Sequence, residues 1–154
     1  MLRTPPTTLA TQAASALPTV NAGGSKITAI KAMQYGRRTL VKIETDAGVA
    51  GYGPCGGTGP FARSVIAGLE GGRLPHLGLI GKDPLAIKVH FHNMFTAYPQ
   101  RGRQTRVLSG IDIALWDLKG KAAGLPIYEL LGGAFRDRVD VYTHFGGATP
   151  EAQA

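Results

Sequence analysis

Two groups of arginines supply the side chains best suited to hold an anion. Arg101, Arg103 and Arg106 form the densest basic group of the chain. Arg37 and Arg38 form a second group elsewhere in the sequence. The planar guanidinium group binds carboxylates and phosphates through paired hydrogen bonds. The net charge is +7, but no run of five like charges occurs and no aromatic ladder separates the arginines, so a small anionic substrate is favoured over a nucleic acid.

Acidic and histidine side chains are not spaced to bind a metal ion. Pairs of acids flank an expected turn, lie on different faces of one expected helix, or precede an expected strand: Glu44 and Asp46, Asp112 and Asp117, Asp137 and Asp140. His90 and His92 are two residues apart, so they cannot face the same way on a helix. The sequence therefore predicts no magnesium site in this chain. We expect Asp112, close to the apolar face of its helix, to be a hydrogen-bonded buried acid.

Three glycines, at positions 51, 53 and 56, match the dinucleotide-binding pattern G-x-G-x-x-G. That pattern requires a buried parallel strand before it and a helix that opens on the third glycine. Here an expected antiparallel hairpin precedes it, Pro54 interrupts it, and more glycines follow before Pro60. The sequence therefore predicts a mobile glycine loop and no dinucleotide site.

Length and composition indicate one globular domain. The chain has 154 residues, 44% of them hydrophobic. Cys55 is the single cysteine, which excludes an internal disulfide and suits a reducing, cytoplasmic compartment. Residues 1–24 are rich in Thr, Ala, Pro and Gly and are expected to form a disordered leader. Ala14-Ser15-Ala16 resembles a signal cleavage site, but no apolar run of ~7–15 residues precedes it, so export is the weaker alternative. No apolar run has membrane-spanning length.

The elements that position these residues are predicted to form an α+β fold. Period-two patterns and turns predict a three-stranded antiparallel meander over residues 27–32, 40–45 and 49–53. Helices follow. One opens at Pro60 and continues to about residue 71, and another starts with Asp83 as N-cap and Pro84 as first residue.

The third and longest helix leads up to Gly124. Asp117 and Lys121 are four residues apart on it, with the acid first, which is the more favourable order. Gly124 is placed to end the helix in a left-handed conformation, and Pro126 starts a short helix after it. One apolar stripe at helical spacing contains Val107, Leu108, Ile111, Leu115, Leu118 and Ala122.

This long helix carries a recognisable string. I-D-I-A-L-W-D-L-K-G-K over residues 111–121, followed by G-x-P-x-Y-x-L-L-G-G over residues 124–133, resembles the end of the enolase superfamily's N-terminal capping domain. Within the superfamily the string is more similar to the mandelate racemase and muconate lactonizing enzyme branch, with its acid-sugar dehydratases. K-I-E-T-D-x-G-x-x-G-x-G, from residue 42 to residue 53, is similar to the family's opening sheet.

The resemblance implies a domain organisation. Residues 25–133 would be the capping domain, and residues 134–154 would start an incomplete (β/α) barrel with its first strand at 139–144. A helix start at Thr149-Pro150-Glu151, three residues before the chain stops, leads us to expect a truncated sequence. In the family, the carboxylates that bind Mg²⁺ and the acid/base residues belong to later barrel strands. We therefore expect no catalytic residue and no bound Mg²⁺ in this chain.

The resemblance also implies a function. The intact relative would be a Mg²⁺-dependent lyase or isomerase, expected to be a homo-oligomer, that acts on a carboxylic acid such as an aldonate. This chain would supply its capping domain and would be inactive alone. Two capping loops, by position 34–38 and 55–61, would close over the acid. The expected substrate contacts are Tyr35, Arg37 and Arg103, together with His144 at the end of the first barrel strand.

Two rival functions are open. One is a stand-alone capping module that acts as an interaction or structural protein. The other, less favoured, is a basic nucleic-acid binder.

Overall fold

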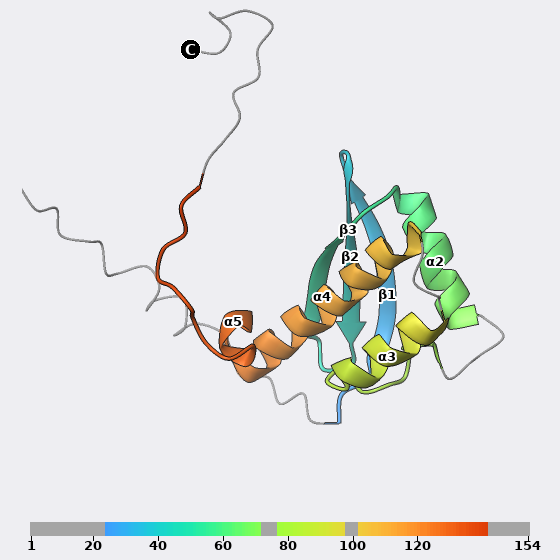
Figure 1. Ribbon diagram of the computed structural model, residues 1–154. Helices are drawn as coiled ribbons and strands as arrows, with labels where there is room; N and C mark the ends of the chain where they lie inside the picture. Colours follow the sequence, from blue (N-terminus) through green and yellow to red (C-terminus); the bar gives the residue numbers. More distant parts are fainter. Residues whose placement is uncertain (1–23, 72–76, 98–101, 142–154) are drawn as a thin grey trace, which may run out of the picture.

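The chain folds as a three-stranded sheet covered by helices. The structure is a computed structural model that describes residues 24–71, 77–97 and 102–141. Figure 1 shows the strands as one layer, with α4 running across one face of the sheet. The elements in chain order are β1 (Ile27–Tyr35), β2 (Arg38–Thr45), β3 (Ala50–Cys55), α2 (Gly59–Gly71), α3 (Ile87–Ala97), α4 (Gln104–Ala123) and α5 (Ile127–Leu130). The predicted α+β class, a meander followed by helices, is confirmed.

The sheet is an antiparallel meander in the order β1-β2-β3. We expected the first two strands to cover residues 27–32 and 40–45, but β1 continues to Tyr35, which pairs with Arg38 in β2. Only two residues separate these partners, and Gly36 has a φ of 56°. A glycine adopts this left-handed conformation without steric cost, so the hairpin turns tightly and the strands extend further than the period-two pattern indicated.

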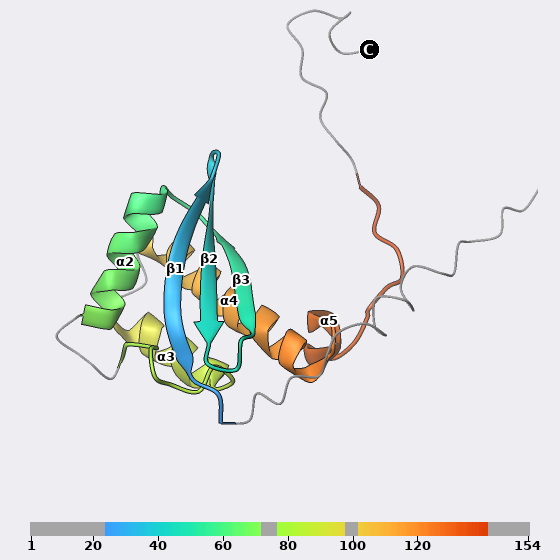
Figure 2. The ribbon, with the colours of Figure 1, turned by 180° about the vertical axis from the view of Figure 1, so that it is seen from behind.

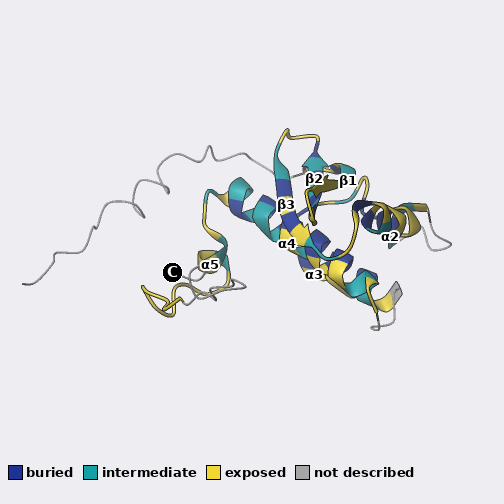
Figure 3. Cartoon of the chain, turned by 90° about the horizontal axis from the view of Figure 1, so that it is seen from above, coloured by how far each residue is buried: buried dark blue, intermediate teal, exposed yellow. Residues whose placement is uncertain are grey.

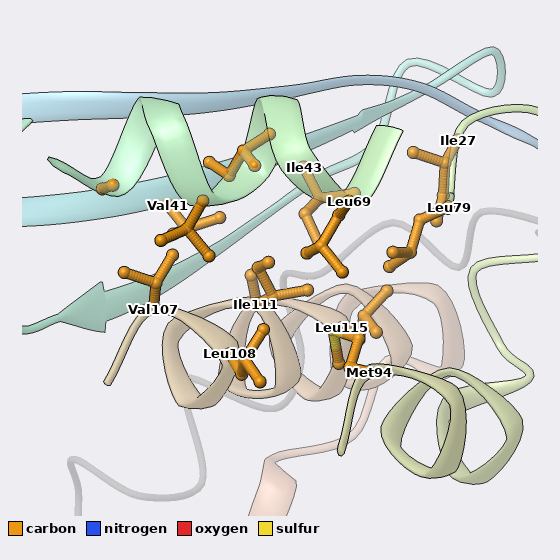
Figure 4. Close-up of a cluster of buried hydrophobic side chains, with 14 of the residues drawn as sticks. Ile27, Val41, Ile43, Leu69, Leu79, Met94, Val107, Leu108, Ile111 and Leu115 are labelled. Carbon is orange, nitrogen blue, oxygen red and sulfur yellow. The ribbon is translucent and has the colours of Figure 1, made fainter. Parts of the chain in front are cut away.

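The hydrophobic core lies between the sheet and the helices. Alternate residues of β2 face it, among them Val41 and Ile43, which are fully buried. Side chains from α4, α2 and α3 meet them there (Figure 4). The predicted stripe on α4 is confirmed for Val107, Leu108, Ile111, Leu115 and Leu118, while Ala122 is only half-buried.

The two faces of the sheet differ. Figure 2 shows the strands from behind, with α4 and α3 on their far side, and Figure 3 shows the buried stripe of α4 turned toward the sheet. The uncovered face carries charged side chains in ion pairs. Glu44 Oε2 lies 2.6 Å from Lys31 Nζ, and Glu44 Oε1 lies 2.7 Å from Lys42 Nζ.

Glycines allow α4 to approach β3 closely. A Cβ atom added at Gly53 would lie 2.0 Å from the carbonyl oxygen of Gly110, and one added at Gly51 would lie 2.0 Å from that of Ala114. Both glycines are buried residues of β3. The third strand predicted over residues 49–53 is therefore confirmed, and at these two positions the glycine pattern reflects helix–strand packing. The antiparallel hairpin expected before them is confirmed.

Polar contacts also hold α4 against β3. The Asp117 carboxylate accepts a hydrogen bond from the backbone N–H of Tyr52 at 2.8 Å. Lys121 donates to the same carboxylate and to the carbonyl oxygen of Ala50 at 3.0 Å. The predicted Asp117–Lys121 pair is confirmed, and it joins two elements that lie far apart in the sequence.

Asp112 does not have the role that we expected. It is half-buried, and within the described residues no hydrogen bond reaches its carboxylate. Burial raises the pKa of Asp112, and the nearby Lys88 opposes that rise only in part. Asp117 therefore makes the contact that was expected of Asp112, because its position on the helix places it beside β3.

Asp112→Asn is expected to stabilise the protein modestly at neutral pH. Because the pKa of Asp112 is raised in the folded state, its favourable contribution is complete below the unfolded-state pKa and is lost as the pH rises through the folded-state value. Asparagine stays neutral, so the gain appears at about pH 7 and disappears at about pH 3 in urea unfolding. Asp137→Asn, at an exposed site, is the control. An equal effect of Asp112→Asn at both pH values would contradict the prediction.

The helix predicted from Asp83-Pro84 starts later than expected. The structure begins α3 at Ile87. The Asp83 side chain instead accepts a hydrogen bond from the backbone N–H of Leu85 at 2.8 Å and closes a turn. The buried His90 ring lies with Nε2 2.7 Å from the Asp83 carbonyl oxygen, which ties this turn to α3.

The end of α4 follows the prediction. Gly124 has a φ of 66°, and its N–H bonds to carbonyl oxygens of the last turn. Pro126 precedes α5.

The strand expected over residues 139–144 is absent from its described part, residues 139–141. Val139 and Val141 are 69% and 90% exposed. A strand needs a hydrogen-bonded neighbour, and the described sheet contains only β1, β2 and β3. Residues 142–154, with His144, and residues 1–23 of the expected leader lie outside the described parts, so the proposed domain boundaries stay a prediction.

Candidate functional site

A hollow of about 210 Å³ lies where the connection after β3 faces the first turn of α4. Figure 1 shows both segments at the same end of the molecule. The hollow is lined by Gly56, Gly57, Thr58, Phe61, Arg103 and Arg106. It thus joins the glycine loop to two of the three arginines of the densest basic group.

The loop that forms one wall is held by the β1–β2 hairpin. Thr39 Oγ1 donates a hydrogen bond to the carbonyl oxygen of Gly57 at 2.8 Å. Gln34 Oε1 accepts one from the N–H of Gly59 at 3.1 Å. Gly57 has a φ of 100°, a conformation that side chains other than glycine rarely adopt. The hairpin therefore sets the position of the loop without contributing its tip to the hollow.

Arg106 forms the opposite wall, and Gly56 makes room for it. A Cβ atom at Gly56 would lie 2.5 Å from Arg106 Cδ, so the aliphatic part of the arginine lies directly against the loop backbone. We did not expect Arg106 among the contact residues. The sequence contained a signal for this contact, because Arg103 and Arg106 are three residues apart at the start of a helix and share a face there.

The hollow is electropositive. Arg103 is the N-cap of α4, no side chain caps this end of the helix, and its first turn contains no acidic residue. The N-terminus of a helix carries a partial positive charge, which an arginine at this position increases. Every acidic residue except Glu151 lies in the described part of the chain, and none lines the hollow. An anion is therefore the complementary ligand.

The predicted contact residues are only partly brought together. Arg103 lines the hollow, beside the predicted loop 55–61. Tyr35 and Arg37 lie at the tip of the β1–β2 hairpin, where Tyr35 is 82% exposed, and neither lines the hollow. His144 lies outside the described residues. These substrate contacts remain predictions.

Cys55 stands at the entrance to this loop. Burial raises the pKa of its thiol, so the sulfur stays protonated near neutral pH. A Cβ atom at Gly110 would lie 2.6 Å from Cys55 Cβ, which shows that the side chain packs against α4. Its role in the described structure is packing.

The acidic residues of the described segments do not fit a magnesium ion. Hydrogen bonds from Lys31 and then Lys42 lower the pKa of Glu44, and hydrogen bonds from the Lys26 N–H and the Ser25 hydroxyl lower that of Asp46. Glu70 accepts hydrogen bonds from the N–H groups of residues 79 and 80. Within the described ranges, no group of three or more His, Cys, Asp or Glu residues could hold a metal ion. No step of a reaction is therefore assigned to a metal on these residues.

Among the helices of residues 24–71, 77–97 and 102–141, none is both long and apolar enough to cross a membrane.

A three-stranded antiparallel meander followed by helices is the architecture of an enolase-superfamily N-terminal domain. The chain belongs to the mandelate racemase / muconate lactonizing enzyme family, whose N-terminal domain matches residues 11–132. The predicted family is confirmed. The matched region begins within the residues that we expected to form a leader.

Curated relatives of the chain are D-galactonate dehydratases. The protein from Variovorax paradoxus is 43% identical over 129 residues, which cover 81% of this chain and 32% of the relative. The protein from Xanthomonas campestris pv. campestris (strain B100) is 42% identical over 130 residues, which cover 82% of this chain and 33% of the relative. The chain thus spans about a third of the length of these relatives.

Solved structures share the fold. An enolase from Agrobacterium radiobacter with bound sodium and L-malate has a TM-score of 0.66 and 33% identity, covering 76% of this chain and 30% of that one. An enolase-superfamily member from Salmonella Typhimurium has a TM-score of 0.66 and 32% identity, and the match covers 84% of this chain and 35% of that one. A mandelate racemase/muconate lactonizing protein from Paracoccus denitrificans, complexed with magnesium, has a TM-score of 0.59 and 32% identity, covering 73% and 31%.

Proposed function

We propose that this chain is the capping part of a cytoplasmic, homo-oligomeric, Mg²⁺-dependent enzyme that dehydrates a sugar acid such as an aldonate. The observation that carries the proposal is the hollow in which Arg103 and Arg106 face the glycine loop without an acidic partner among the lining residues. The D-galactonate dehydratase relatives support the substrate class.

In this proposal the chain binds and orients the substrate but does not perform the chemistry. Magnesium and the base that removes the proton beside the substrate carboxylate come from the part of the relatives that this chain does not span. The guanidinium groups donate hydrogen bonds to substrate oxygens, and the loop, held by Thr39 and Gln34, excludes water. The hairpin tip with Tyr35 and Arg37 is a second wall that meets the substrate when the site is complete.

The experiment compares the chain alone with a fusion. The 154-residue chain is expected to show no dehydration of D-galactonate with Mg²⁺. Joined to the remaining C-terminal part of the Variovorax relative, it is expected to form the 2-keto-3-deoxy acid, and chelation of Mg²⁺ should abolish this activity. Arg103→Gln should lower kcat/KM by about 10- to 100-fold, because a charge-assisted hydrogen bond is lost.

Arg136→Gln is the control for the fusion, since it removes the same charge at an exposed position beside Phe135. Mg²⁺-dependent turnover by the chain alone would contradict the proposal. The proposal would also be contradicted if Arg103→Gln left kcat/KM of a folded, active fusion unchanged.

A further inference from the structure

We propose that Gln34 is a positioning residue that joins the two capping loops, residues 34–38 at the hairpin tip and residues 55–61 after β3, into one unit. This inference rests on the proposed function, in which the two loops form two walls of the substrate site. It goes beyond that function because it assigns the spacing of the walls to one side chain. Gln34 itself does not line the hollow.

The two ends of the Gln34 amide bind different loops. Its Oε1 accepts a hydrogen bond from the N–H of Gly59 at 3.1 Å, and its Nε2 donates one to the carbonyl oxygen of Gly36 at 3.1 Å. A backbone N–H can only donate and a carbonyl oxygen can only accept, so this bridge needs an acceptor and a donor on the same side chain. The glutamine amide supplies both. We call these two hydrogen bonds the Gln34 clamp.

Gly59 leaves the space that the Gln34 side chain occupies. A Cβ atom added at Gly59 would lie 2.9 Å from Gln34 Oε1 and 3.2 Å from Gln34 Cβ. Gly59 is buried and is the first residue of α2, and Phe61, which lines the hollow, follows it on the same helix. The clamp therefore positions the start of α2 and, with it, one lining residue of the hollow.

At its other end the clamp holds the hairpin turn. Gly36 lies between Tyr35 and Arg37, the two side chains that the proposed function places against the substrate. The pairing of Tyr35 with Arg38 closes the turn, and the bond from Gln34 to Gly36 ties the closed turn to α2. Groups that are already ordered lose less conformational entropy when a ligand binds. We therefore expect the clamp to strengthen substrate binding although it touches no substrate atom.

The first test is NMR spectroscopy on the full 154-residue chain. Gln34→Met keeps the length of the side chain and removes both bonds. Hydrogen exchange at the Gly59 amide should then rise by about 3- to 10-fold, and the carbonyl-carbon resonance of Gly36 should shift. Gln34→Glu keeps the acceptor but removes the donor, so the Gly36 resonance should shift while the Gly59 amide stays protected.

Gly59→Ala tests the connection between the loops without changing any polar group. The new methyl group displaces the Gln34 amide, so the Gly36 resonance should shift although Gly36 belongs to the other loop. Thr28→Val is the control, because Thr28 is an exposed residue at the far end of β1 from the turn. It should leave the signals of Gly36 and Gly59 unchanged.

The second test measures the kinetics of the fusion to the C-terminal part of the Variovorax relative. The two walls bind the substrate and do not perform the chemistry. Gln34→Met and Gly59→Ala should therefore raise KM by about 3- to 10-fold and leave kcat within about twofold of its original value. Thr28→Val should change neither constant. A merely structural role of Gln34 would instead reduce the amount of folded enzyme, which lowers the apparent kcat without raising KM.

Two results would overturn the assignment. One is a Gly36 resonance that stays in place in folded Gly59→Ala, as checked by circular dichroism. The other is an active Gln34→Met fusion with an unchanged KM. If Gln34→Met does not fold, Gln34→Glu and Gly59→Ala decide the outcome in the same way. A fusion that dehydrates no sugar acid would count against the proposed function, while the NMR test on the chain alone would still show whether Gln34 joins the two loops.

Discussion

Replacing Gly53 with alanine is expected to lower the free energy of unfolding by about 3 kcal/mol or more. The added methyl group would lie 2.0 Å from the carbonyl oxygen of Gly110 and 2.8 Å from the backbone nitrogen of Ala114. Both atoms belong to the backbone of α4, so no side-chain rotation relieves the clash. The helix must move away from β3, and buried contacts between them are lost. Urea unfolding monitored by circular dichroism measures the change.

Gly71→Ala is the matched control for this substitution. Gly71 is an exposed residue at the end of α2, and an added Cβ atom there meets nothing within 4 Å. Its replacement is expected to be neutral or to stabilise by up to about 1 kcal/mol, because alanine restricts the unfolded chain. If the two variants unfolded at the same urea concentration, the proposed close approach of α4 and β3 would be wrong.

Leu115→Ala is the second substitution with a large expected effect, a loss of about 2–5 kcal/mol. Leu115 is 0% exposed and belongs to the cluster that joins α4 to the sheet and to α3 (Figure 4). Truncation removes buried apolar surface and leaves a cavity that closely packed neighbours fill only in part. The midpoint and slope of urea unfolding together give the change in stability.

Ile113→Ala, two residues away on the same helix, is the control. Ile113 is 40% exposed, so its truncation creates no closed cavity and is expected to reduce stability by less than about 1 kcal/mol. A loss at Ile113 equal to that at Leu115 would show that α4 presents a different face to the sheet.

These two pairs of variants also bear on the site. The hollow exists because the start of α4 lies beside the loop after β3, and the close approach at Gly53 and the buried side of α4 set that distance. A variant that loosens the helix should therefore weaken anion binding as well as stability. Arg103→Gln changes the charge of the hollow alone.

Local patterns were sufficient to predict much of the fold. The period of two in β2 predicted which residues face the core, and the apolar stripe of α4 predicted its buried side. Gly124 and Pro126 predicted where the long helix ends and the short one begins. These features depend on the conformational preferences and the spacing of residues close together in the sequence, so the sequence alone is enough to predict them. The string over residues 111–121 predicted the family through its resemblance to the end of the family's capping domain.

Two features that the sequence did not predict depend on contacts between distant segments. The strand that contains Gly53 was predicted, but only the packed helix shows why a side chain is excluded at this position. Asp112 was expected to be the hydrogen-bonded acid, but the tertiary structure places the backbone N–H of Tyr52 beside Asp117. The late start of α3 has a local cause, since the Asp83 side chain accepts a hydrogen bond from the N–H of Leu85 and closes a turn before the helix begins.

The sequence by itself determined the strands, the helices, the family and the presence of clustered arginines. Only the tertiary structure decided that Arg103 and Arg106 share a hollow with Gly56 and Gly57, and that Tyr35 and Arg37 do not line it. The physical reason is the distance along the sequence over which the interactions act. Secondary structure follows from interactions between near neighbours, whereas a binding hollow is formed by segments that are brought together only when the sheet and α4 bury their apolar faces against each other.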